Sequence, residues 1–147
     1  MAAATGDAGA PRDELGAHVS VAGGIATAPA RAAAIDSHVI QVFTKQPNRW
    51  AEPKIDEVTA AEFRRERAAH DIEFVVSHDS YLINLSSPDE ALWERSLASF
   101  TAELRRCTAL GLEALVTHPG NATDRDTEAG IERNARGVTE ALRAVPG

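Results

Sequence analysis

The chain has 147 residues and a formal net charge of −7, with 44% hydrophobic and 25% charged residues. This length predicts one domain of ordinary size, and the apolar fraction excludes a wholly disordered chain. The acidic balance argues against a histone-like binder that works through bulk positive charge. It leaves room for a nucleic-acid enzyme, which needs only local phosphate contacts.

Targeting signals and cysteine usage narrow the class further. No apolar run approaches the ~18 residues of a membrane span, and residues 1–11 lack an apolar signal core, so we expect a cytoplasmic protein. Cys107 is the only cysteine, which excludes an internal disulfide and a cysteine-based zinc cluster. Any metal site must therefore use His, Asp and Glu side chains.

The first part of the chain predicts a leader, a strand, a helix and a second strand. Residues 1–13 contain mostly Ala, Gly, Asp and Pro without a period, which is typical of a disordered leader. The apolar run Leu15–Val19 predicts a short strand. Gly23-Gly24 ends it, and an alanine-rich helix follows to about Ala34. The β-branched run Val39–Phe43 predicts a buried strand.

Two capping boxes predict where the longer helices begin. The pattern Thr59–Glu62, with Val58 and Phe63 as a hydrophobic staple, predicts a helix over Ala60–His70. The pattern Ser87–Glu90 predicts the start of another helix, with proline at its first position.

The remaining elements complete an alternation of strands and helices. Strands are predicted at Phe74–Ser77 and Ala114–Thr117, and Gly111 is expected to end the helix between them. One face of that helix is predicted to carry Trp93, Leu97, Phe100, Leu104 and Cys107. The apolar stripe of the last helix is predicted to contain Ile131, Ala135, Val138 and Leu142.

This order predicts four βα units with parallel strands and helical crossovers, an α/β architecture. A flavodoxin-like open sheet fits the length. So does half of an eight-stranded barrel, because a whole one needs ~250 residues. The period alone leaves both open.

Two histidines follow neighbouring predicted strands. His78 ends the third strand and His118 ends the fourth, one βα unit later. Active sites of parallel α/β folds lie at the carboxyl ends of the strands, and adjacent strands are ~5 Å apart, so two imidazoles there could reach one metal ion. The alternative is two unrelated histidines that cap backbone groups. His18, on the first strand, is expected to face a barrel interior and not to be a ligand.

The loops after the strands suggest contacts with a flat or anionic ligand. Tyr81 and Leu82 follow His78 in an apolar stretch, which suits stacking on or wedging between rings, unless both side chains pack under the next helix. Lys45, Arg49 and Trp50 form a small basic and aromatic loop, which is plausible for backbone phosphates.

The segments GAHVSVAGG, QVFTKQPNRW, SHDSYLINL and LGLEALVTHPG, in this order and spacing, resemble the endonuclease IV (deoxyribonuclease IV) family of AP endonucleases. The resemblance covers about residues 15–145. It implies a (βα)8 barrel that uses a trinuclear zinc cluster to cut double-stranded DNA 5′ to abasic sites. The cut leaves a 3′-hydroxyl and a 5′-deoxyribose phosphate, as in base excision repair.

The resemblance also implies roles for single residues. His78 and His118 match the two histidines that bind one zinc, and Tyr81 and Leu82 match a pair that enters the minor groove. Many family members have an arginine where this chain has Asn48. Arg49, one position later, is the candidate to replace it.

The resemblance also implies that residues 14–147 are the N-terminal half of a longer barrel. The bridging glutamate and later ligands of the family would follow Gly147, so we expect the chain alone to be inactive. We expect the full-length protein to be a monomer that does not bind membranes. The chain alone should be a dimer that closes a pseudo-barrel, a loosely packed monomer, or insoluble, because its edge strands are unpaired. A xylose-isomerase-like metal-dependent sugar isomerase or epimerase is the main alternative, and a half-barrel interaction module is the third.

Overall fold

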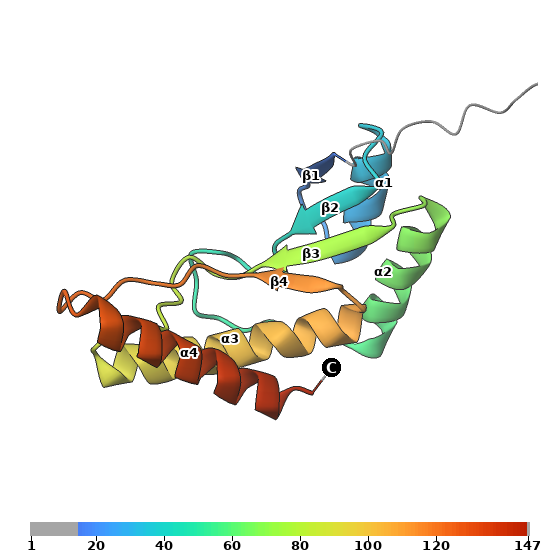
Figure 1. The fold of residues 1–147 in the computed structure, drawn as a ribbon. Coiled ribbons are helices and arrows are strands. Elements are labelled where there is room, and N and C mark those ends of the chain that lie inside the picture. The colour runs from blue at the N-terminus through green and yellow to red at the C-terminus, as the bar shows by residue number, and fades with distance from the viewer. Residues whose placement is uncertain (1–14, 147) are drawn as a thin grey trace, which may run out of the picture.

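The computed structural model describes residues 15–146, so the predicted leader at residues 1–13 lies outside the described residues. Within that range the chain forms one four-stranded sheet in which each strand is parallel to its neighbour (Figure 1). The strands are β1 (Gly16–His18), β2 (Val39–Val42), β3 (Phe74–His78) and β4 (Ala114–Val116).

The order of the strands decides between the two predicted architectures. A doubly wound open sheet reverses its strand order at a switch point, whereas neighbouring strands of a (βα)8 barrel follow one another in the chain. The observed order is β1-β2-β3-β4, with β1 and β4 at the two edges. The half-barrel prediction is therefore confirmed, and the flavodoxin-like alternative is wrong.

The helices cover one face of this sheet. Ile40 and Val42 are buried in the core beside Ala28 and Phe63, whereas Val39 and Gln41 on the opposite face are only partly buried. Figure 1 shows α3 and α4 running side by side along the sheet. No helix within residues 15–146 is long and apolar enough to cross a membrane. The helical elements are η1 (Ile25–Thr27), α1 (Ala28–Ala33), α2 (Glu57–Ala69), α3 (Glu90–Leu110) and α4 (Thr127–Ala144).

The hydrophobic core has two parts. The first lies between β2, β3 and the helices α1 and α2, and its largest side chain is Phe63, which is fully buried. The second lies between α3 and α4, where Leu85 and Phe100 pack against Ala141. Burying a side chain of this size stabilises the fold by about 1.5–3 kcal/mol, so each part holds its helices against the sheet. Gly111 ends α3 in the left-handed conformation, with a φ of 71°, as predicted.

Both predicted helix starts are wrong by a few residues. Helix α2 begins at Glu57, because the side chain of Asp56 accepts a hydrogen bond from the backbone N–H of Thr59. Val58 is exposed and forms no staple with Phe63. Helix α3 begins at Glu90 after the N-cap Asp89, so Pro88 precedes the helix. In each case an aspartate forms the N-cap, in place of the Thr or Ser that begins the predicted capping box.

The predicted apolar stripe of α4 is only partly correct. Ile131 and Leu142 are exposed, and the buried positions of this helix are Gly130, Gly137 and Ala141. A Cβ atom at Gly137 would lie 2.9 Å from Cδ2 of Leu85, so α4 approaches the core along its smallest residues. The helix therefore packs closely through small residues and leaves two large apolar side chains at the surface.

Candidate functional site

A row of rings lies along the carboxyl ends of the strands. The ring of Phe43 stands between His18 and His78, with centroid distances of 4.7 and 5.4 Å. The ring centroids of His78 and His118 are 5.0 Å apart. The parallel register brings these side chains together, because β3 and β4 pair from Val76 with Ala114 to His78 with Val116. The two histidines predicted to share a metal are therefore neighbours.

The orientation of His78 leaves one ring nitrogen available. Its Nδ1 atom lies 2.9 Å from the backbone carbonyl oxygen of Asp79. A carbonyl oxygen only accepts, so Nδ1 carries the proton and Nε2 of the neutral ring has a free lone pair. Histidines that bind metals are held in this way by a hydrogen bond from the other ring nitrogen.

His18 has the opposite arrangement. Its Nδ1 atom lies 2.8 Å from the amide nitrogen of Gln41, which donates, so the proton of the neutral ring is on Nε2. Partial burial, and to a smaller extent the nearby His78, lower the pKa of His18. This arrangement suits His18 to donate a hydrogen bond and leaves it without a free lone pair for a metal.

Asp79, which the sequence analysis did not single out, joins the ends of β3 and β4. It is fully buried, its backbone N–H donates to the carbonyl of Val116 at 3.0 Å, and its carboxylate accepts a hydrogen bond from the Thr117 hydroxyl. Burial raises the pKa of Asp79 to about 6, against the opposing effect of the Thr117 hydrogen bond. The sequence contained one signal that could have identified Asp79: a carboxylate that directly follows a histidine at the end of a predicted strand.

The described residues contain two candidate metal ligands but no complete metal site. The two imidazoles fit zinc in chemistry and in separation, but residues 15–146 contain no group of three His, Cys, Asp or Glu side chains that could hold a metal ion. A catalytic zinc needs at least three protein ligands. His78 and His118 are therefore suited to be two ligands of a larger set.

The third loop (residues 79–86) presents an aromatic ring at the same edge. Tyr81 is 58% exposed, and its ring meets those of Phe43 and His78 edge to face, with centroids 5.5 and 5.6 Å apart. Leu82 beside it is half-buried. The alternative that both side chains pack under the next helix is therefore wrong for Tyr81. Its ring is held in place by other rings while one side stays open.

The second loop (residues 43–55) carries the other predicted contacts. Asn48 and Arg49 are exposed, and Trp50 is half-buried under the guanidinium of Arg95, which lies 4.5 Å from the ring centroid. The prediction that Lys45 contacts phosphates is wrong, because its side chain is only 1% exposed and its Nζ atom binds Glu52. The positive charge of Lys45 is neutralised inside the protein.

The second and third loops are joined at one atom. The carbonyl oxygen of Pro47 accepts hydrogen bonds from the hydroxyl of Ser80, at 2.7 Å, and from the backbone N–H of Tyr81, at 3.1 Å. The segment that carries Asn48 is therefore fixed relative to Tyr81.

The loop after β4 is fixed to the third loop by Asn84. Its Oδ1 atom accepts from the backbone N–H of Asn121, and its Nδ2 atom donates to the Asn121 carbonyl. Gly120 has a φ of 88°, and a Cβ atom there would lie 2.2 Å from Oδ1 of Asn84. Only glycine allows this close approach beside His118.

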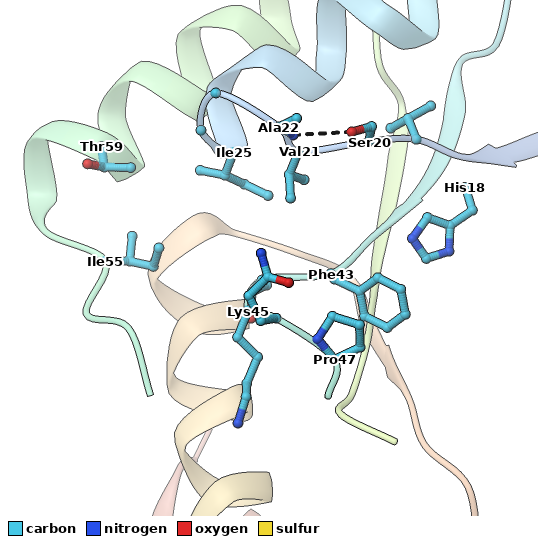
Figure 2. Close-up of a pocket in the computed structure, with 15 residues that line it drawn as sticks. His18, Ser20, Val21, Ala22, Ile25, Phe43, Lys45, Pro47, Ile55 and Thr59 are labelled. Atoms are coloured by element: carbon cyan, nitrogen blue, oxygen red, sulfur yellow. Dashed lines mark hydrogen bonds between the residues drawn. The ribbon is translucent and has the colours of Figure 1, made fainter. Parts of the chain in front are cut away.

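A cavity of about 770 Å³ opens beside His18, between the segment after β1 (residues 19–25) and the second loop. Figure 2 shows Val21, Ile25 and Ile55 pointing into it, while the Lys45 side chain runs away toward α3. The walls are largely apolar, and the cavity lies along the same edge as the row of rings. Its shape and largely apolar walls suit a flat or apolar group.

Comparison with known proteins identifies relatives of this chain. Residues 29–146 match the family model described as a xylose isomerase-like TIM barrel. The chain is 42% identical over 134 residues to a probable endonuclease 4 of Geobacter sulfurreducens, which covers 91% of this chain and 45% of the relative. It is 41% identical over 128 residues to a probable endonuclease 4 of Chloroflexus aurantiacus, 45% of which is covered. The chain thus spans about half the length of the curated relatives it matches.

Solved structures show the same relationship. The crystal structure of endonuclease IV from Thermus thermophilus matches with a TM-score of 0.79 and 34% identity, over 90% of this chain and 47% of that one. A D-psicose 3-epimerase matches with a TM-score of 0.66, over 87% of this chain and 47% of that one, but with 17% identity, which shows a shared fold alone.

Proposed function

The chain belongs to the family of xylose isomerase-like TIM barrels. From its similarity to proteins named probable endonuclease 4, we propose that it provides one half of the active site of a zinc-dependent endonuclease. The substrate is double-stranded DNA, cut 5′ to an apurinic or apyrimidinic site. The observation that carries the proposal is the placement of the neighbouring His78 and His118 beside the exposed ring of Tyr81. Residues 14–147 are taken as the N-terminal half of the barrel domain.

The two histidines have the metal-binding role in this proposal. His78 would bind through Nε2, because the Asp79 carbonyl holds the proton on Nδ1, and His118 would bind beside it. Bound zinc supplies Lewis-acid activation of the phosphodiester and of the attacking water. The buried Asp79 keeps the two strand ends at a fixed separation through its contacts with Val116 and Thr117. The remaining ligands of a trinuclear cluster would come from outside the described residues.

Exposed and half-buried side chains of the second and third loops have the DNA-binding role in this proposal. Tyr81 and Leu82 would fill the gap in the minor groove that remains when the abasic nucleotide is flipped out, because inserted aromatic and apolar side chains replace lost stacking. Asn48 and Arg49 lie exposed on the adjoining loop, where they would reach the backbone or the gap. The products are a 3′-hydroxyl and a 5′-deoxyribose phosphate, as base excision repair requires. A DNA substrate is consistent with the cytoplasmic location expected from the sequence.

The second candidate is a metal-dependent sugar isomerase or epimerase with the same barrel. The D-psicose 3-epimerase structures support this candidate by fold alone, with TM-scores of 0.66 and 0.63 at 17% identity. Tyr81 favours the nuclease, because a tyrosine that is 58% exposed suits a large substrate better than an enclosed sugar pocket.

The test uses the full-length protein with zinc and a duplex that contains one tetrahydrofuran analogue of an abasic site. We expect incision 5′ to the analogue and tighter binding than to the intact duplex. Tyr81→Ala should weaken this preference about tenfold or more, since a stacking contact contributes roughly 1–3 kcal/mol. Tyr81→Phe, which keeps the ring, should bind like the wild type. Equal affinity for both duplexes without incision, or epimerisation of a ketohexose, would contradict the proposal.

A further inference from the structure

A cluster of four charged side chains lies under the second loop: Lys45, Glu103 and Arg106 are buried, and Glu52 is partly exposed. The Nζ atom of Lys45 contacts Oε1 of Glu52 at 2.5 Å and the hydroxyl of Ser99 at 3.1 Å. The other carboxylate oxygen of Glu52, Oε2, accepts a hydrogen bond from Nη1 of Arg106 at 2.7 Å. Glu52 therefore bridges two cations whose side chains are only 1% and 5% exposed.

Glu103 connects this cluster to the ends of two strands. Its side chain is fully buried, and it forms an ion pair with Arg106. Its Oε1 atom accepts hydrogen bonds from the hydroxyls of Thr44 and Ser77, which lie just after β2 and directly before His78. The cluster contains two cations and two anions, so its charges balance.

The cluster holds one particular segment of the chain. Lys45 and Glu52 flank residues 46–51, which include the exposed Asn48 and Arg49. Pro47 is held from the other side by the third loop. Burial alone would raise the pKa of Glu52, but hydrogen bonds from Lys45, Ser99 and Arg106 outweigh this effect and lower it.

A buried ion cluster of this kind is weak evidence for stability, because removing charges from water costs about as much as their attraction returns. The cluster affects the geometry of the loop more directly. A charge removed from water has a low free energy only where its oppositely charged or hydrogen-bonding partners contact it. Without the negative charge of Glu52, Lys45 would have no anionic partner and would gain by turning toward water. Because Lys45 lies in the loop itself, that movement would shift residues 46–51.

We infer that Glu52 is a positioning residue that acts through Lys45 and Arg106 to hold residues 46–51 in the conformation that presents Asn48 and Arg49 to the DNA backbone. The inference rests on the proposed function for the identity of the ligand. The geometry that carries it is the bridge of two buried cations by one carboxylate at the base of an exposed segment.

Glu113 offers a matched control at the opposite end of the sheet. Its side chain is 33% exposed, compared with 30% for Glu52, and it is also paired with an arginine, Arg67, at 2.6 Å. One of its oxygens accepts from the backbone N–H of Val75. Glu113→Gln therefore removes a similar charge from a similar environment, far along the strands from the second loop.

The experiment compares Glu52→Gln and Glu113→Gln in the full-length, zinc-loaded protein. Amide hydrogen exchange at residues 45–51 and affinity for the abasic-analogue duplex are measured, together with zinc content. For Glu52→Gln we expect faster exchange in that segment and about tenfold weaker binding, with zinc content unchanged. Glu52→Asp, which keeps the charge, should recover part of the affinity. Glu113→Gln should lower the melting temperature without either effect.

The outcomes separate this inference from the proposed function. If both Gln variants change DNA affinity by the same factor, or if neither does, the positioning role of Glu52 is wrong. If the wild type shows no preference for the abasic duplex, the proposed function is wrong. Hydrogen exchange still decides the structural part in that case, because unchanged protection at residues 45–51 in Glu52→Gln would overturn it and increased exchange would support it.

Discussion

The hydroxyl of Thr117 donates a hydrogen bond to the buried carboxylate of Asp79, so the ends of β3 and β4 are joined by a side-chain contact. Asp79 directly follows His78, and Thr117 directly precedes His118. The separation of the two imidazoles therefore depends on this bond as well as on the pairing of the strands.

Removal of the Thr117 hydroxyl should weaken both the fold and the metal site. Thr117→Val keeps the shape of the side chain but leaves the Asp79 carboxylate without its donor, which should destabilise the protein by about 1–3 kcal/mol. Urea unfolding and zinc titration measure the two effects. Thr108→Val is the control, because the Thr108 hydroxyl is exposed and bonds only to a carbonyl of its own helix. Equal losses in the two variants would show that the contact between the strands has no special role.

Replacement of either predicted zinc ligand should release metal. We expect His78→Ala and His118→Ala each to reduce the zinc content of the full-length protein and to abolish most incision, because one imidazole cannot replace a pair. Zinc and protons compete for imidazole, so zinc affinity should also fall at acidic pH. Elemental analysis of the purified variants measures the loss, with His38→Ala, near the amino end of β2, as the control. Unchanged zinc content in both variants would show that His78 and His118 are not zinc ligands.

The turn after His118 should tolerate only glycine at position 120. Gly120→Ala places a Cβ atom 2.2 Å from Oδ1 of Asn84 in a residue whose φ is 88°, and backbone strain of this kind costs roughly 1–3 kcal/mol before the clash is added. Gly111→Ala is a useful comparison, because φ there is 71° but the nearest atom is 3.9 Å away. Thermal unfolding should show the larger loss for Gly120→Ala, and the reverse order would contradict the close approach of Gly120 to Asn84.

The cap of α2 should make stability depend on pH in the acidic range. The backbone N–H of Thr59, and then its hydroxyl, lower the pKa of Asp56 from its ordinary value of 3.8. A carboxylate with a lowered pKa stabilises the folded state above its unfolded pKa, and this contribution is lost as the pH falls through the folded value. Asp56→Ala should therefore lower the melting temperature at neutral pH, with a smaller difference from wild type below about pH 4.

Asp56→Asn provides the control for that prediction. Asparagine also caps helices but does not titrate, so this variant should lose stability less steeply than the wild type between about pH 4 and pH 3. Parallel acid profiles for the wild type and Asp56→Asn would show that the Asp56 charge has no part in the effect.

The strands were predictable because their signals are local, whereas the half-barrel was implied by the family resemblance, since the period of strands and helices alone left an open sheet possible. The run Val39–Phe43 is apolar and β-branched, and the observed β2 lies within it. The helix starts were less certain, since Asp56 and Thr59 both fit an N-cap and only the observed backbone shows which one accepts the bond. Helix α4 packs against Leu85 through Gly137, and this leaves Ile131 exposed. The apolar period of the helix could not predict this, because glycine does not count as an apolar position.

The burial of the charged side chains under the second loop could not be predicted from the sequence, for another reason. Lys45, Glu103 and Arg106 have the composition of a solvated surface, and Lys45 in a loop suggested a phosphate contact. Their burial depends on partners as many as 62 positions apart, such as Thr44 and Arg106. His78 and His118 were easier, because the βα period places both at the same end of the sheet, although their role as ligands stays a proposal.

The carbonyl group of Pro47 has a consequence for exchanging parts between relatives. It accepts hydrogen bonds from both Ser80 and Tyr81, so the conformations of the second and third loops depend on each other although 33 positions separate Pro47 from Ser80. A chimera that takes only one of these loops from a relative would pair that carbonyl with a backbone of different shape. Chimeras that transplant both loops together should keep this contact and should melt at a higher temperature than chimeras that transplant one loop, provided that the partners of the loops at Ser99, Arg106 and Asn121 are unchanged.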